Sequence, residues 1–203
     1  MLLAAALLAA SPPPSLAGFY QAQQMEVGAA LELKKDGHFR YQLDYGAVSE
    51  QAEGDWTFDG KTLRLTSRPM PKLPSFELVR DDPAPKGEVS MTVEPPGFGD
   101  GYRLDAVAID ADSGEKGLVT TDSDGRVEAG AHRLASVDPM VPVYGTVAGH
   151  FLLSPDRGHR LLLRFHANDL GHAAFEGEPL EVSSGALVLR RYDAEIRFVR
   201  VRP

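Results

Sequence analysis

The sequence predicts an all-β protein: a small antiparallel meander or barrel followed by a β-sandwich. Apolar and polar residues alternate along several short segments, and Gly and Asp turn signals separate these segments. No window of about 12 residues carries the 3.6-residue apolar period of a helix. With 203 residues, 43% of them hydrophobic and 25% charged, the chain has the composition of a globular protein.

Two hairpins are predicted near the N-terminus. In each, an Asp-Gly pair separates two alternating segments, at Asp36-Gly37 and at Asp59-Gly60, and this pair is a strong signal for a tight hairpin turn. The alternating segments are 31–34, 39–44, 53–58 and 63–66. Four strands between residues 31 and 67 predict a meander with one solvent-exposed face. We expect this meander to span residues 18–82.

A change of composition marks the end of this meander. The segment that follows is interrupted by Pro69, Pro71, Pro74, Pro83 and Pro85. Because proline cannot donate to a strand ladder, we expect a domain boundary near 82–86. Beyond it, short apolar segments at turn spacing predict a β-sandwich over 87–203. They are 89–93, 104–109, 118–121, 151–153, 160–165, 186–190 and 196–201.

The first residues have the pattern of an export signal. Residues 1–10 form an apolar run that is shorter than the roughly 20 residues of a membrane-spanning helix. Small residues at Ser15 and Ala17 predict cleavage before Gly18, with the bond between Ala10 and Ser11 as a second candidate. We therefore interpret 1–17 as a signal peptide, although no Lys or Arg precedes the run, and expect a periplasmic or secreted protein.

Charge and cysteine content exclude several classes of function. The formal net charge of -8 works against sequence-independent binding of nucleic-acid phosphates. The chain has no cysteine, which excludes disulfides, thiolate catalysis and cysteine metal sites. No second stretch is apolar enough for a membrane-spanning helix. We expect no nucleic-acid partner and no membrane span.

The histidines and paired aspartates invite a metal site. His166 and His172 are six residues apart, a spacing that does not place two imidazoles on one helix face. Asp110/Asp112 and Asp122/Asp124 are spaced like part of a calcium loop, but the remaining ligands of that loop are missing. We favour aspartates that cap their own turns and histidines on the surface, and expect no metal.

Catalytic motifs are also missing. The sequence contains no G-x-S-x-G, S-x-x-K or H-E-x-x-H, and the segment from Ser154 to His159 has no strand-to-helix elbow that would expose a serine. The Gly-rich segment 97–101 is not followed by a helix that would offer its N-terminal amides to a phosphate. We assign no catalytic residue and no cofactor.

Aromatic residues are concentrated between Tyr20 and Phe58. Tyr41, Tyr45 and Trp56 are the candidate ligand-binding residues, since inward-facing aromatics line the mouth of a small barrel. The alternative, which we favour, is that the aromatics fill the core of a unit too small to be stable without that bulk.

Two segments resemble known families. The segment Tyr102 to Ile109, followed by Gly117-Leu118-Val119-Thr120-Thr121-Asp122-Ser123-Asp124-Gly125-Arg126, resembles carboxypeptidase regulatory-like and transthyretin-like β-sandwich modules, which implies a non-catalytic sandwich. The two hairpins, with Asp36-Gly37-His38-Phe39 and Gly54-Asp55-Trp56, resemble small lipocalin-like domains. The whole chain resembles uncharacterised exported proteins of Gram-negative bacteria that pair these two halves, and this resemblance implies no activity.

These observations predict an exported, non-enzymatic binding or interaction module of the bacterial periplasm. Its partner is a small molecule or a protein that the sequence does not identify. Two alternatives stay open at this point: a hydrolase or lyase with a carboxylate-based site, and a structural envelope protein without a small-molecule site. A cleft that holds two carboxyl groups with raised pKa favours the first, and a flat hydrophobic patch favours the second.

Overall fold

The computed structural model describes residues 16–25, 27–94, 98, 101–127, 133–183, 185–192 and 194–201. These residues form strands and turns and no helix, which confirms the prediction of an all-β protein. They divide into two compact units. One unit holds the residues up to Pro71 together with those from Gly171 onward, and the other runs from Lys72 to Leu170.

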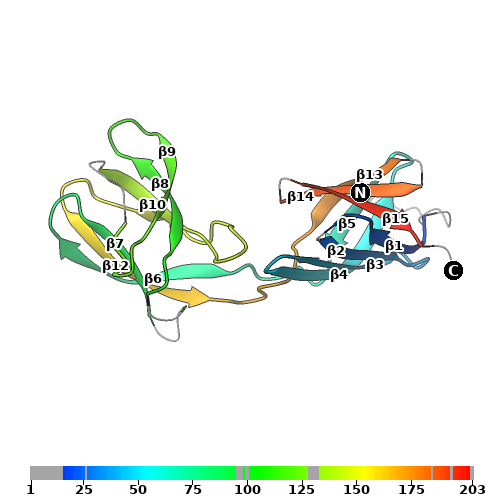
Figure 1. Ribbon diagram of the computed structural model, residues 1–203, viewed down its shortest axis with the longest axis horizontal. Coiled ribbons are helices and arrows are strands. Elements are labelled where there is room, and N and C mark those ends of the chain that lie inside the picture. Colours follow the sequence, from blue (N-terminus) through cyan, green and yellow to red (C-terminus); the bar gives the residue numbers. More distant parts are fainter. Residues whose placement is uncertain are drawn as a thin grey trace, which may run out of the picture. The chain divides into compact units, whose positions relative to one another are not determined.

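The first unit is a closed barrel of eight strands (Figure 1). Each strand pairs antiparallel with the next one along the chain, and β5 pairs with β13 across the second unit's residues. The ring is closed where β1 pairs with β15, with Tyr20 opposite Arg200. The strands are β1 (Gly18–Ala22), β2 (Val27–Leu33), β3 (His38–Tyr45), β4 (Val48–Phe58), β5 (Thr62–Ser67), β13 (Glu176–Ser183), β14 (Ala186–Arg191) and β15 (Ala194–Arg200).

Local sequence explains the barrel's hairpins. Along β3 the side chains at 39, 41 and 43 are buried and those between them are exposed, as the alternation predicted. Asp59 caps the β4–β5 turn, because its Oδ1 accepts the backbone N–H groups of Lys61 and Thr62 at 2.9 and 2.7 Å. Gly60 follows with φ of 98°, a conformation that glycine adopts without strain. Both predicted Asp-Gly turns are present.

The second unit contains two sheets that share one hydrophobic core, and it is therefore a β-sandwich. In the smaller sheet the order is β6 (Ser75–Ala84), β12 (Gly158–His166), β7 (Val89–Val93). In the larger it is β11 (Phe151–Leu152), β10 (Leu134–Pro139), β8 (Asp105–Asp110), β9 (Lys116–Thr120). The shared core includes Met91 and Leu161 from one sheet and Ala106 and Val137 from the other.

The division of the chain differs from the one we expected. The barrel is built from both ends of the chain: Figure 1 shows the blue and cyan strands beside the orange and red ones. The sandwich lies between them in sequence, so the expected continuous units 18–82 and 87–203 are replaced by a barrel with a sandwich inserted between β5 and β13. β6 extends into the expected boundary at 82–86 and ends at Ala84, with Pro83 in its ladder opposite His159.

The physical reason lies in strand pairing. Alternation of apolar and polar residues identifies a strand and its buried face, but it does not identify the strand that pairs with it. The first five strands leave two open edges, at β1 and β5, and a barrel needs these edges closed. The strands that close them come more than 100 residues later in the chain.

Candidate functional site

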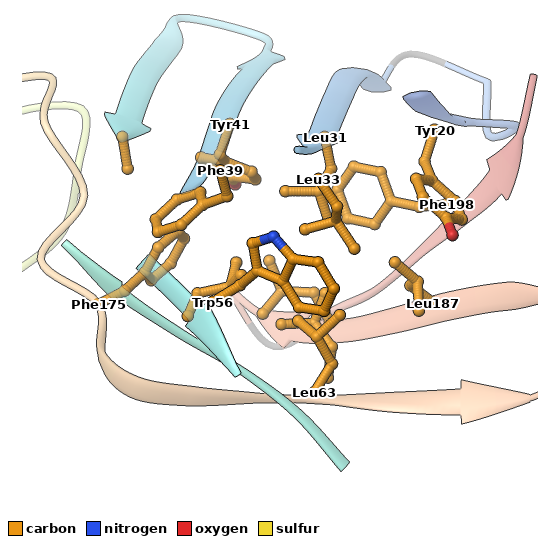
Figure 2. Close-up of a cluster of buried hydrophobic side chains, with 14 of the residues drawn as sticks. Tyr20, Leu31, Leu33, Phe39, Tyr41, Trp56, Leu63, Phe175, Leu187 and Phe198 are labelled. Carbon is orange, nitrogen blue, oxygen red and sulfur yellow. The ribbon is translucent and has the colours of Figure 1, made fainter. Parts of the chain in front are cut away.

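Two of the three predicted ligand-binding residues lie inside the barrel. Trp56 is 2% exposed, and its indole N–H donates to the carbonyl of Lys34 at 3.0 Å. Tyr41 is 3% exposed. Figure 2 shows the indole among side chains that include Leu33 from β2, Leu63 from β5 and Phe175, which directly precedes β13. Their placement supports the core-filling interpretation of these aromatics.

The third residue, Tyr45, lies apart from the other two. It ends β3 and is 47% exposed, so the structure does not bring it into the cluster that holds Tyr41 and Trp56. A ligand site that uses all three side chains stays a prediction. The barrel's own side chains occupy its interior, as is usual for small eight-stranded barrels.

A buried carboxylate that the sequence analysis missed lies beside Tyr41. Glu50 is 4% exposed, and each of its oxygens accepts two hydrogen bonds. Oε1 receives the hydroxyl of Tyr41 at 2.9 Å and Nε of Arg191 at 2.7 Å. Oε2 receives Nη2 of Arg191 at 2.8 Å and the hydroxyl of Tyr192 at 2.7 Å. These bonds occupy the four lone-pair positions of a carboxylate.

The pKa values of the two tyrosines and of Arg191 in this cluster are raised. Burial, followed by the neighbouring Glu50, raises the pKa of Tyr192 to about 12 and raises that of Tyr41 further. Hydrogen bonds and charge from Glu50 outweigh the burial of Arg191, so its pKa is also raised. The two phenols stay protonated and Arg191 stays charged at neutral pH. Since Glu50 has no free acceptor position, the cluster cross-links β3, β4 and β14 rather than presenting a reactive group.

The sequence held one signal for this cluster. Glu50 and Trp56 are six residues apart on β4, an even spacing that places both on the same face of the strand. A charged residue on an apolar face requires a partner, because an unpaired buried charge is costly. Arg191, 141 positions away, was not identifiable as that partner without the fold.

The sandwich contains a second buried polar cluster. His159 is 2% exposed, with Nδ1 2.9 Å from Oδ2 of Asp81 and Nε2 3.0 Å from the backbone oxygen of Ser154. Both ring nitrogens therefore lie within hydrogen-bond distance of an oxygen of the sandwich. Arg157 also donates to Asp81. Because Nε2 faces a backbone carbonyl rather than a hydroxyl, no ring nitrogen is placed to accept a proton from Ser154, as a serine triad requires.

Acid should weaken the sandwich through Asp81. Burial raises the pKa of Asp81, but hydrogen bonds from Arg157 and His159 outweigh burial and leave it below its ordinary value. Its ionised form therefore stabilises the fold above the unfolded pKa of about 3.9, and this contribution disappears as pH falls through the lowered pKa. In urea denaturation, Asp81→Asn should be less stable than wild type at pH 7, and the difference should shrink below pH of about 4.

Asp82 supplies the control for this experiment. It is the next residue on β6, it pairs with Arg80, and both side chains are more than 40% exposed. Asp82→Asn should change the unfolding free energy at pH 7 by less than about 0.5 kcal/mol, as surface pairs do. A difference between wild type and Asp81→Asn that stays constant from pH 7 to pH 2 would contradict the role of Asp81.

The remaining polar candidates behave as turn and surface groups. Oδ1 of Asp110 accepts the N–H groups of Asp112 and Ser113, and Oδ1 of Asp122 accepts those of Asp124 and Arg126. Both aspartate pairs therefore build turns, as we favoured. Within the described residues, no three His, Asp or Glu side chains gather as a metal site would require. Some described carboxyl groups have a pKa that departs from its ordinary value, and in each of them the pKa is lowered. These groups are Asp59, Glu77, Asp81 and Glu181.

A pocket of about 180 Å³ lies at one end of the β8–β9 hairpin. We call it the β9 groove. Its apolar lining comes from Ala108, Gly117, Val119 and Leu134, and its polar lining from Asp110, Ser113, Glu115 and Lys116. The four apolar lining residues and Asp110 lie on the core-facing side of the larger sheet. This follows because Ala108 pairs with Gly117 and Asp110 pairs with Leu134, and residues two apart on a strand share a face.

Gly117 lines this groove and has no side chain to occupy it. A Cβ added at Gly117 would meet no atom within 4 Å, and the residue is not in the left-handed region. The backbone conformation at position 117 is therefore one that other residues also adopt. Glycine at this position leaves open the space that a side chain would occupy. Glycine inside a strand often marks a close approach by a ligand or by another backbone. The sequence contained this signal, Gly117 within an apolar strand, but we interpreted the segment only as a sandwich strand.

Comparison with known proteins finds no matching family, no significantly similar curated protein and no significantly similar solved structure. Among the described residues, no helix has the length and apolar character needed to cross a membrane. Function is therefore argued from the geometry of the two units.

Proposed function

We propose that this chain is an exported, non-enzymatic interaction protein, in which the barrel is a filled scaffold and the sandwich carries the contact surface. The observation that supports this most is the contrast between the units. The barrel's interior holds its own side chains, including Trp56 and Phe198, whereas the sandwich keeps an open groove beside the strand at the end of its larger sheet.

The polar clusters support a non-enzymatic role. The carboxylate of Glu50 has all its acceptor positions filled from within the barrel. The imidazole of His159 has both nitrogens against oxygens of the sandwich. A general acid or base needs a proton position within reach of a substrate, and neither buried group offers one. The carboxylate-based hydrolase or lyase draws no support from these sites.

The size of the groove favours a side chain over a small-molecule ligand. Pockets that enclose drug-sized ligands measure about 300–1,000 Å³, and the β9 groove measures about 180 Å³. A single apolar side chain of a partner polypeptide is the better match. We therefore propose a protein or peptide partner.

Display selection with random peptides tests this function, with Gly117→Val as the comparison protein. Valine at 117 fills the groove, and the open space and ordinary backbone there let the variant fold. Valine also has a higher strand propensity than glycine. Wild type should enrich peptides that bind Gly117→Val at least tenfold more weakly. Failure to enrich any peptide, or equal binding to both proteins, would contradict the proposal.

Export is part of the proposal and is tested separately. The run 1–10 lies outside the described residues. Leu16 and Ala17 do contact the barrel: Tyr20 donates its hydroxyl to the carbonyl of Leu16 at 2.8 Å, and Ala17 is buried. Cleavage between Ala10 and Ser11 retains these contacts, and cleavage before Gly18 removes them. The intact mass of periplasmic protein should correspond to a start at Ser11 or Gly18, and retention of Met1 would contradict export.

A further inference from the structure

We propose that two copies of this chain associate through the outer face of the larger sheet, so that one sandwich packs against the other. The outer face is the surface formed by Val107 and Ile109 of β8, Leu118 of β9 and Leu152 of β11. Three observations carry this inference: these apolar side chains are neighbours, a buried hydroxyl between them has no partner, and the sheet is apolar on both faces. The inference goes beyond the proposed function, which concerns the core-facing side of the same sheet.

The register of the sheet brings these side chains together. Val107 of β8 pairs with Leu118 of β9. Ile109 pairs with Ser136 of β10, and Ser136 pairs in turn with Leu152. Because paired residues share a face, and so do residues two apart on one strand, all five side chains project from one side of the sheet. All four strands of the larger sheet contribute to this surface.

This side of the sheet points away from the sandwich core. Ala108 lies between Val107 and Ile109 on β8, and it belongs to the core that both sheets share. On the outer face, Leu118 is 68% exposed and Leu152 is 78% exposed. Single exposed apolar residues are common on protein surfaces, but neighbouring ones that form a patch mark an interaction site.

The sequence of the larger sheet also indicates a covering layer on each face. β8 reads Asp-Ala-Val-Ala-Ile-Asp, with four apolar residues in succession. Strands that are buried on both faces typically show such runs, whereas a strand with one solvent-exposed face alternates, as β3 does. The smaller sheet supplies one of these layers, on the core-facing side.

A buried hydroxyl on the outer face lacks a hydrogen bond. Ser136 is 1% exposed, and its Oγ has no partner among the described residues. Such groups are rare, because a buried hydroxyl without a partner has lost water and gained no bond. Leu152 lies beside it and is highly exposed, so its side chain is free to change rotamer when a second sheet packs there. A polypeptide can supply the missing hydrogen bond, and a lipid acyl chain cannot.

The composition of the face favours a second copy of the chain. Homodimer interfaces are more apolar than transient ones, and their centres are poor in charge. Asp105 accepts the hydroxyl of Thr120, Asp138 pairs with His150, and Lys116 stands at a corner of the face. An aliphatic surface and a hydroxyl that both donates and accepts are each complementary to a copy of themselves, as a two-fold interface requires.

The size of the face predicts weak association. Four strands about 4.8 Å apart and about 20 Å long present a flat area on the order of 300–400 Å². Specific interfaces bury about 800 Å² per partner, so we expect a dissociation constant in the micromolar range. Each copy carries a net charge of -8, and the resulting repulsion is screened by salt. Dimerisation should therefore strengthen as the salt concentration rises.

Sedimentation-velocity ultracentrifugation of the purified chain tests the proposal. Between about 1 µM and about 500 µM, sedimentation should change from that of one chain to that of two. Leu118→Asp and Leu152→Asp should each weaken dimerisation by about tenfold or more, because they bury a carboxylate against an apolar surface. A chain that remains monomeric up to about 500 µM would overturn the proposal.

Three variants serve as controls. Leu73→Asp makes the same change at a leucine that is 60% exposed and lies outside the larger sheet, so dimerisation should be unchanged. Leu118→Met keeps an apolar side chain and should also dimerise. Gly117→Val alters the core-facing side and should block the β9 groove without affecting dimerisation, which separates this proposal from the proposed function. Equal dimerisation of Leu118→Asp and wild type, or an equal loss in Leu73→Asp, would contradict the assignment to the outer face.

Ser136→Ala tests the buried hydroxyl. It should weaken dimerisation about threefold or more without lowering the unfolding free energy of the monomer, because the hydroxyl has no bond to lose there. A destabilised monomer with unchanged dimerisation would contradict its role in the interface. Phosphatidylcholine vesicles test the other occupant of an apolar face. Vesicle binding by a chain that stays monomeric, lost in Leu118→Asp, would assign the face to a lipid surface and overturn the dimer.

Discussion

Replacing Trp56 with alanine is expected to destabilise the barrel by about 3–5 kcal/mol, the usual cost of truncating a fully buried aromatic side chain. The indole is 2% exposed and packs with Leu33, Leu63 and Phe175, so its removal leaves a cavity where several strands meet (Figure 2). The backbone carbonyl of Lys34 also loses its indole donor. Hydrogen exchange of the barrel amides measures the change without needing the tryptophan.

Two further variants define this result. Trp56→Phe keeps an apolar ring and loses the N–H, so it should cost less than Trp56→Ala. Tyr45→Ala removes an aromatic residue that is 47% exposed and should change the unfolding free energy by less than about 0.5 kcal/mol. If Trp56→Ala costs less than about 1 kcal/mol, the indole is not a core residue, and the ligand site predicted at Tyr41, Tyr45 and Trp56 regains support.

Removal of the Glu50 charge is the second large expected effect. Glu50→Gln should cost the barrel about 3–5 kcal/mol, because it leaves the guanidinium of Arg191 without its buried counter-charge. The side chain of Glu50 is 3% exposed and that of Arg191 is 23% exposed. Trp56 is the chain's single tryptophan and lies in the barrel, so its fluorescence during urea denaturation reports this unit.

The matched control for Glu50 lies on the same strand. Glu53→Gln neutralises an exposed carboxylate of β4 and should change stability by less than about 0.5 kcal/mol. The double variant Glu50→Met, Arg191→Met removes both charges and should recover most of the loss, as buried pairs commonly do when replaced by apolar side chains. Stability of Glu50→Gln equal to that of wild type would contradict the role assigned to this carboxylate.

Features that depend on neighbouring residues were predictable from the sequence. The alternation through Phe39, Tyr41 and Leu43 identified β3 and its buried face, and Asp59-Gly60 identified the turn that follows β4. These signals span a few residues, so one sequence contains them completely. The all-β class follows from many such signals together.

Features that depend on distant pairing were not predictable. The barrel closes because β13 pairs with β5 and β15 pairs with β1, and nothing in the segments 186–190 or 196–201 distinguishes a barrel strand from a sandwich strand. The polar clusters were not predictable for the same reason. Glu50 meets Arg191 across 141 positions, and Asp81 meets His159 across 78. Each residue alone is an ordinary charged or polar position in a strand.

The candidate groove stands between these two cases. Gly117 is an isolated glycine in a strand pattern, which is a recognisable sign of close backbone approach. That its missing side chain opens a pocket beside Ala108 and Leu134 follows only from the pairing of β8 with β9 and β10.

Amide hydrogen exchange, measured residue by residue with and without a peptide selected by display, tests the central claim most directly. A peptide side chain seated in the β9 groove should slow the exchange of amides in the β8–β9 hairpin around Ala108 and Gly117. The barrel amides around Trp56 should be unaffected. Protection that appears in the barrel and not in this hairpin would contradict the assignment of the contact surface to the sandwich.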